Sequence, residues 1–244
     1  MTVIILAAGY ATRLYPLTEN FPKPLLKVGE KTIVDWLIDD LRESKEVSRF
    51  LIVTNHRFAP IFEQWAKDKK DVEIIDDGTS SNETRLGAVK DILYALKTAS
   101  VKDDILVLAG DNVLDFSLNK LLEYCKSKKT SCTMRYYEEN EKTLTKRGVL
   151  EVGEDDLLLG MEEKPAIPKT HWCCPPFYYY VKEDADKLED ALKEGCGYDA
   201  PGSFVSYLLK RAPVHAMVMP GKRYDIGDIH SYEEVQKTYK GIMR

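Results

Sequence analysis

Two carboxylates and two cations stand at separate places along the chain, and together they could bind a metal ion and a polyphosphate. Arg13 and Lys23 lie in a loop near the N-terminus. Asp111 follows the apolar run 105–108, and Asp225 lies in a Tyr-Asp-Ile-Gly turn. Carboxylates are hard ligands that suit Mg²⁺, whereas arginine and lysine neutralise phosphate charge. We therefore expect a metal-assisted reaction at phosphate, provided that the fold brings these side chains together. Turn or cap residues are the alternative for each aspartate taken singly.

The N-terminal loop has features of a phosphate-binding turn. It follows the apolar segment 3–6, and open α/β sheets bind ligands at the carboxyl ends of their strands. Small residues let the backbone approach a ligand and present its N–H groups. These small residues are Ala7, Ala8, Gly9 and Ala11. The loop has neither the Walker A pattern nor the Rossmann glycine pattern, so a tight turn with two solvated cations is the alternative.

Strands and helices alternate through the first half of the chain. Apolar runs predict strands at 3–6, 50–53, 72–75 and 105–108, and helical periodicity predicts helices at 33–44, 58–69 and 86–96. Helices of this length between strands indicate βαβ crossovers and a parallel sheet covered by helices.

The second half has a more mixed pattern. It predicts helices at 118–126, 183–195, 204–210 and 231–239, and strands at 130–137, 148–152, 157–162, 177–181 and 214–219. We therefore predict an α/β fold, a Rossmann-like three-layer sandwich with a mostly parallel central sheet extended by a mixed second half. Since no repeat or low-complexity linker marks a boundary, we expect a single domain over residues 1–244.

The composition excludes several classes of protein. The chain has 244 residues, a formal net charge of −5, 44% hydrophobic and 31% charged residues, which excludes disordered and collagenous chains. A mildly acidic chain lacks the basic face that nucleic-acid binding requires. No apolar run approaches the roughly 20 residues of a membrane span, so we expect a cytoplasmic protein with no membrane or nucleic-acid partner. The oligomeric state cannot be read from the sequence.

The segment from Leu6 to Leu26 resembles the signature of the sugar nucleotidyltransferases, which join a sugar 1-phosphate to a nucleoside triphosphate and release pyrophosphate. The similarity covers Leu-Ala-Ala-Gly-x-Ala-Thr-Arg-Leu and, further on, Pro-Lys-Pro-Leu. Later segments follow the family's order, namely Ala-Gly-Asp-Asn at 109–112, Glu-Glu-Lys-Pro at 162–165 and Tyr-Asp-Ile-Gly at 224–227. The motifs are most similar to those of the glucose-1-phosphate thymidylyltransferases and span almost the whole chain.

The resemblance implies a nucleotide-binding half, 1–112. It gives catalytic roles to Arg13, Lys23 and Asp111, and it places Mg²⁺ as cofactor on Asp111 and Asp225. It also implies that the nucleotide contacts Leu6, Ala7, Ala8, Gly9, Arg13, Asn82, Gly87 and Asp111. Helix capping by Asn82 or Thr84 is the alternative for the loop before the helix at 86–96.

A sugar-binding half, 113–244, is implied in the same way. There, the family likeness makes Glu163 an acceptor of sugar hydroxyl hydrogen bonds, Lys164 a cation for the sugar phosphate, and Gly148 a backbone contact to the sugar. The alternatives are an ordinary charged turn and the start of a strand.

Three features bear on how far the resemblance extends. The resemblance favours dTTP or UTP as the triphosphate. The loop 77–87 lacks the glutamine that thymine- and uracil-specific relatives carry, however, so CTP and GTP stay open. Ala11 replaces a glycine that many relatives have, and we expect it to avoid a positive φ because it carries a methyl group. The chain ends at Arg244, which leads us to expect no β-helical module after the last motif.

Two other functions remain possible. One is a cytidylyltransferase for a non-sugar phosphate such as phosphocholine, although Glu-Glu-Lys-Pro disfavours it. The other is a catalytically silent regulatory subunit on the same fold, which the presence of all four charged side chains disfavours.

Overall fold

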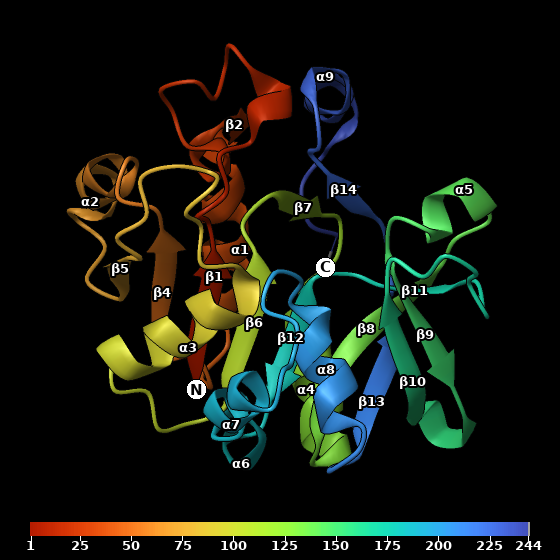
Figure 1. The fold of residues 1–244 in the computed structure, drawn as a ribbon. Coiled ribbons are helices and arrows are strands. Elements are labelled where there is room, and N and C mark those ends of the chain that lie inside the picture. Colours follow the sequence, from red (N-terminus) through yellow and green to blue (C-terminus); the bar gives the residue numbers. More distant parts are fainter. Residues whose placement is uncertain (244) are drawn as a thin grey trace. The chain divides into compact units, whose positions relative to one another are not determined.

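The computed structural model describes residues 1–243, which form two compact units (Figure 1). Unit 1 comprises Met1–Arg85, Ala109–Asn119 and the chain from Pro220 onward. Unit 2 comprises Leu86–Leu108 and Lys120–Met219. Each unit therefore contains segments that are distant in sequence.

Unit 1 contains a parallel sheet, as predicted. Its strands are β1 (Thr2–Leu6), β4 (Arg49–Thr54) and β5 (Val72–Asp76), with β4 paired in parallel to both neighbours. The side chains of Val3, Ile4 and Ile5 are fully buried, because this strand has apolar residues on both faces. The predicted alternation is confirmed here.

Helices α1 (Ile33–Leu41) and α2 (Ala59–Ala66) connect the strands of this sheet (Figure 1). The α1 helix begins at Thr32, whose side chain accepts a hydrogen bond from the Asp35 N–H, and it buries an apolar face. That face comprises Ile33, Val34, Leu37, Ile38 and Leu41. Both helices start close to their predicted positions and end three residues earlier than predicted.

Short elements complete unit 1. They are the single-turn 3-10 helices η1 (Thr12–Leu14) and η2 (Lys23–Leu25), the hairpin β2 (Lys27–Val28) and β3 (Lys31–Thr32), the strands β7 (Asn112–Leu114) and β14 (Arg223–Asp225), and the helix α9 (Ile229–Thr238). The antiparallel pair β7–β14 joins segments more than a hundred residues apart and was not predicted. It places Asp225 opposite Asn112, the neighbour of Asp111.

Unit 2 contains a mixed sheet, as predicted for the second half. Its strands are β6 (Ile105–Ala109), β8 (Ser131–Tyr137), β9 (Gly148–Val152), β10 (Leu158–Glu163), β11 (Trp172–Cys174), β12 (Phe177–Tyr180) and β13 (Val214–Val218). Strand β12 lies antiparallel between β6 and β8, whereas β13 runs parallel to β8. Strands β11, β9 and β10 extend the sheet in antiparallel order.

The helical segments of unit 2 are α3 (Ala88–Thr98), α4 (Asn119–Lys128), α5 (Glu141–Leu144), η3 (Glu154–Asp156), α6 (Lys182–Ala185), α7 (Leu188–Lys193) and α8 (Gly202–Leu208). The single helix predicted over 183–195 is wrong, because α6 and α7 are separate. Buried Asp184 accepts hydrogen bonds from Ser131 Oγ and Lys187 Nζ, which favours a turn there. Among the described residues, no helix combines the length and apolar character needed to cross a membrane.

Candidate active site

The carboxyl end of β1 opens into a cavity of about 210 Å³ within unit 1. It is lined by Leu6, Ala7, Gly9, Ala11, Arg13, Leu14, Lys23, Pro24, Ala109, Gly110, Asp111 and Gly227. The Ala7 N–H donates to Val53 O at 2.8 Å, and the Gly110 N–H donates to Leu6 O at 2.9 Å. These bonds place the loop after β1 beside the Gly-Asp-Asn segment, as expected for the ligand end of a parallel sheet.

Gly110 is required by this close approach. A methyl group at Gly110 would lie 3.1 Å from Ile5 Cγ2 and 3.2 Å from Leu6 O, tighter than ordinary van der Waals contact. A larger residue would separate the two chain segments that form the cavity wall.

The prediction that Ala11 avoids a positive φ is wrong. Its φ is 47° and its ψ is 42°, which is the left-handed conformation. The carbonyl of Ala11 accepts a hydrogen bond from the buried Thr18 Oγ1 at 2.8 Å and another from the Leu14 N–H at 2.9 Å. These two bonds offset the methyl group's steric cost of about 1–2 kcal/mol.

Lys23 and Asp111 meet across the cavity. Lys23 Nζ lies 2.9 Å from Asp111 Oδ2, although the two residues are 88 positions apart. The lysine side chain is 9% exposed and the aspartate side chain 39% exposed. The ammonium is therefore held among protein atoms, while the carboxylate is open to solvent.

A chain of polar contacts joins Asp111 to Asp225. Asn112, fully buried, donates to Asp111 Oδ1 at 2.6 Å and accepts from the Arg223 guanidinium at 2.7 Å. The same Arg223 nitrogen lies 3.5 Å from Asp225 Oδ2. Ile226 N–H donates to the carbonyl of Asp111 at 3.2 Å. The two aspartates predicted as metal ligands are thus tied into one small region of unit 1.

The donor set in this region fits Mg²⁺. This ion binds proteins through one or two carboxylates and takes its other ligands from phosphate oxygens and water. Asp111 and Asp225 supply two carboxylates, and no cluster of three or more histidine, cysteine or acidic ligands occurs between residues 1 and 243. An ion at this place would therefore depend on substrate phosphate for part of its coordination.

Arg13 lies on the open side of the cavity. It is exposed, and its guanidinium nitrogens lie 3.8 and 3.9 Å from the place where a methyl group on Gly227 would stand. Its position on the short helix η1 brings it to the same cavity as Lys23. The cavity thus has one buried cation and one exposed cation.

No role was predicted for Asn55 from the sequence. Its side chain is fully buried at the carboxyl end of β4, where its amide donates to Ala8 O at 3.0 Å and its carbonyl accepts the Phe58 N–H at 3.1 Å. The asparagine therefore holds the small-residue loop against the start of α2. Its position directly after a predicted strand was the available signal.

Asn82 and Gly87 do not line the unit 1 cavity. Asn82 is exposed and accepts a hydrogen bond from Arg85 at 3.2 Å. Neither Asn82 nor Thr84 caps the following helix, so that alternative is wrong. Gly87 itself precedes α3 with a φ of 92°. A methyl group on Gly87 would lie 2.7 Å from Tyr198 O, so only glycine fits there.

Unit 2 brings Gly148, Glu163 and Lys164 together. Glu163 at the end of β10 pairs with Gly148 at the start of β9, and the Lys164 N–H donates to Arg147 O at 2.9 Å. Lys164 has a φ of 49°, so the chain turns sharply directly after the glutamate. The three predicted sugar-site residues are therefore neighbours.

Burial raises the pKa of the Glu163 carboxyl above its ordinary value, and the Lys164 charge and the Gly202 N–H oppose this effect. Glu163 also lines a cavity of about 370 Å³ in unit 2, together with Met161, Glu162, Glu194, Gly195, Cys196, Gly197, Ser203, Ser206, Tyr207 and Lys210. A half-buried carboxylate that lines a cavity is suited to accept hydrogen bonds from a polyol.

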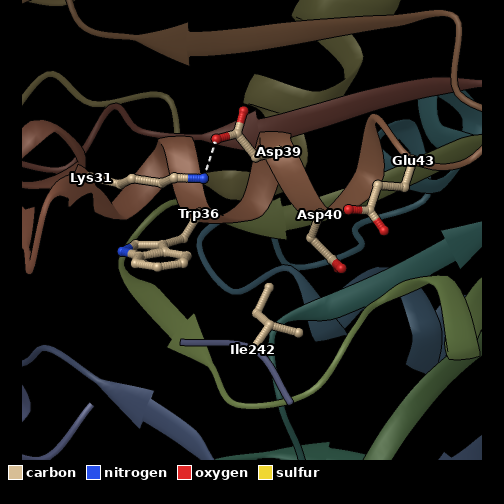
Figure 2. Close-up of a pocket in the computed structure, with 6 residues that line it drawn as sticks. All are labelled: Lys31, Trp36, Asp39, Asp40, Glu43 and Ile242. Atoms are coloured by element: carbon tan, nitrogen blue, oxygen red, sulfur yellow. Dashed lines mark hydrogen bonds and ion pairs between the residues drawn. The ribbon is translucent and has the colours of Figure 1, made fainter. Parts of the chain in front are cut away.

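Unit 1 has a second hollow, of about 320 Å³, beside α1 (Figure 2). It shares no lining residue with the cavity at β1; its lining comprises Lys31, Trp36, Asp39, Asp40, Glu43 and Ile242. Lys31 binds Asp39 at 2.7 Å, and buried Asp40 accepts the Leu118 N–H at 2.7 Å. The acidic groups of this hollow are thus already engaged in holding the fold.

The whole chain from residue 2 to residue 241 matches the family model described as Nucleotidyl transferase. The chain belongs to the nucleotidyl transferase family. Its relatives include the bifunctional protein GlmU of Methanococcus maripaludis, 27% identical over 93% of this chain and 51% of that protein. Another is a glucose-1-phosphate adenylyltransferase of Thermotoga maritima, 26% identical over 95% of this chain and 58% of that protein. The chain thus spans about half the length of the curated relatives it matches.

A solved structure supports the fold. UDP-glucose pyrophosphorylase complexed with UDP-glucose superposes with a TM-score of 0.80 and 19% identity, covering 98% of this chain and 97% of that chain. The predicted α/β fold and the predicted family are confirmed. For the nucleotidyl transferase chain described here, the roles of individual residues stay predictions.

Proposed function

We propose that this nucleotidyl transferase moves a nucleotidyl group from a nucleoside triphosphate to a sugar 1-phosphate and releases pyrophosphate. The observation that supports it most is the contact between Lys23 Nζ and Asp111 Oδ2, at 2.9 Å in a cavity walled by the small-residue loop. A cation and an approachable backbone suit the phosphates of a triphosphate, and an exposed carboxylate suits the Mg²⁺ that accompanies it.

The reaction is an in-line displacement at the α-phosphorus. A phosphate oxygen of the sugar 1-phosphate forms a bond to this phosphorus as the bond to the pyrophosphate oxygen breaks, so no covalent enzyme intermediate is needed. Lys23 and Arg13 neutralise the charge that moves onto the leaving pyrophosphate. Backbone N–H groups of Ala8 and Gly9 bind the remaining phosphate oxygens.

Asp111 and Asp225 hold Mg²⁺ in this proposal. When bound, the ion neutralises phosphate charge and aligns the reacting groups. The protein's own contribution is positional, because Asn112 orients Asp111 through a hydrogen bond of 2.6 Å.

The sugar phosphate binds through Gly148, Glu163 and Lys164. The carboxylate accepts hydrogen bonds from sugar hydroxyls, and the ammonium binds the phosphate. Asn82 and Gly87 contribute to the nucleotide side, where dTTP or UTP is favoured and CTP and GTP stay open.

Pyrophosphate release tests the proposal directly. The protein is mixed with Mg²⁺, each of ATP, CTP, GTP, UTP and dTTP, and the 1-phosphates of glucose, mannose and N-acetylglucosamine. We expect release with at least one hexose 1-phosphate. Turnover of CTP with phosphocholine and none with the sugars would replace the proposal by the phosphocholine reaction. No turnover with any pair would favour a silent subunit.

A further inference from the structure

The Glu163 carboxylate lies between two glycines. A methyl group on Gly148 would lie 3.4 Å from both Glu163 Oε1 and Oε2, and one on Gly202 would lie 2.2 Å from Oε1. The second distance is far below any real contact, whereas the first is ordinary van der Waals contact. The Glu163 carboxylate therefore lies closer to Gly202 than to Gly148, and it leaves no room for a side chain at position 202.

Helix α8 is fastened to strand β10 at this place. Ser206 Oγ donates to Met161 O at 2.8 Å. Gly202 lies four residues earlier, on the same face of the helix, and the Glu163 carboxylate occupies the space that a side chain on Gly202 would take. One turn of the helix thus binds the strand backbone and packs against the carboxylate two residues further along the strand.

We propose that Gly202 is a positioning residue for the sugar-binding carboxylate: because it has no side chain, it leaves the space that Glu163 occupies. This inference rests on the proposed function, because it assumes that Glu163 accepts sugar hydroxyls. Any side chain at position 202 must displace this carboxylate and the Met161 methyl group from their present places.

The experiment measures KM for the sugar phosphate and for the triphosphate in Gly202→Ala, using the hexose 1-phosphate and triphosphate with the highest kcat/KM in the panel above. We expect the sugar KM to rise about tenfold or more, as when a charged hydrogen-bonding group is misplaced, with the triphosphate KM within about twofold. The matched control is Gly160→Ala on the same strand, where the methyl group meets only the flexible end of Glu151. Both KM values should then stay within about twofold.

A double-mutant cycle separates positioning from a loss of structure. In a Glu163→Ala background, Gly202→Ala should add less than about twofold to the sugar KM, because no carboxylate is left to displace. Should Gly202→Ala not fold, Met161→Ala is added, because the Met161 methyl lies 2.0 Å from the new methyl group. In this double variant the new methyl group at position 202 still meets Glu163. The KM for the sugar phosphate must therefore rise as it does in Gly202→Ala alone.

Glu163→Gln separates this inference from the proposed function. If Glu163→Gln leaves the sugar KM unchanged, the proposed sugar role of Glu163 is wrong. If Glu163→Gln raises the sugar KM and Gly202→Ala does not, the positioning role of Gly202 is overturned and the sugar role of Glu163 stands. The same follows if the effects of the two substitutions on the sugar KM are additive.

Discussion

Lys23 Nζ and Asp111 Oδ2 form an ion pair of 2.9 Å in which the cation is the buried partner and the anion the exposed one. This inverts the usual arrangement of a surface lysine, whose ammonium reaches into water. Since the carboxylate faces the cavity, its oxygens can bind a metal ion that also binds a phosphate. The lysine stays close to the same phosphate charge.

Replacement of Asp111 by asparagine should reduce turnover by about a hundredfold or more, because a neutral amide is a weak Mg²⁺ ligand. Pyrophosphate release at saturating substrates measures this, and isothermal titration with Mg²⁺ and triphosphate should show weaker metal binding. Exposed Asp190→Asn in unit 2 is the control. Near-full activity of Asp111→Asn would remove the metal assignment.

Arg13→Ala should lower kcat more than it raises KM for the triphosphate, because its guanidinium contact strengthens as charge moves to the leaving group. Arg13→Lys should recover only part of the loss, since an ammonium cannot form a two-pronged contact. Steady-state kinetics at several triphosphate concentrations separate the two constants. A pure KM effect would make Arg13 a binding residue.

Asn55→Asp should weaken triphosphate binding about tenfold, because the change keeps the size of the side chain but replaces the amide that donates to Ala8 O by a second acceptor. Titration calorimetry of the triphosphate measures the effect. Asn140→Asp is the matched control, because Asn140 only accepts, from the Lys142 N–H. Equal affinities for the two variants would contradict a role of Asn55 in shaping the loop.

Ala11→Gly should raise the free energy of unfolding by about 1 kcal/mol. Alanine at a φ of 47° has a steric cost that glycine lacks, which outweighs the entropy that glycine adds to the unfolded chain. Urea denaturation monitored by circular dichroism gives the value. Ala99→Gly, at a φ of −89°, should instead lower it. Equal signs for the two changes would show that the conformation of Ala11 is unstrained.

Glu163→Gln should stabilise the protein at neutral pH while it impairs sugar binding. The pKa of Glu163 is raised by burial, so the folded state binds its proton more tightly than the unfolded chain does. The contribution of Glu163 to the free energy of unfolding is therefore greatest below the ordinary glutamate pKa. It is lost as the pH rises through the raised pKa of the folded protein. Thermal unfolding should show a higher Tm for Glu163→Gln at pH 8 and no gain at the acidic end.

Exposed Glu162→Gln is the control for this pH dependence. The difference in Tm between Glu162→Gln and the wild-type protein should be the same at every pH in that range. In the wild-type protein, the KM for the sugar phosphate should rise as the pH falls through the raised pKa, because only the ionised carboxylate accepts two hydroxyls. A sugar KM that is independent of pH would contradict this role.

The amino-acid sequence by itself determined the regular elements and the family. Buried strands such as β1 and amphipathic helices such as α1 are encoded by neighbouring residues, so their periodicity can be read locally. The loop from Leu6 to Leu26 and the Gly-Asp-Asn segment were recognisable for the same reason. Among the predicted helices, the one at 183–195 was wrong, because buried Asp184 interrupts an otherwise helical pattern.

Only the tertiary structure decided which residues meet. The β7–β14 pair is too short to show an alternating pattern, and its strands lie more than a hundred residues apart, so the link from Asp111 to Asp225 was invisible in the sequence. The left-handed Ala11 depends on a hydrogen bond from Thr18, and the space at Gly202 depends on β10. The contacts at Asp225 and Gly202 join distant parts of the chain, and the bond from Thr18 spans seven residues, so no single-residue propensity contains their free energy.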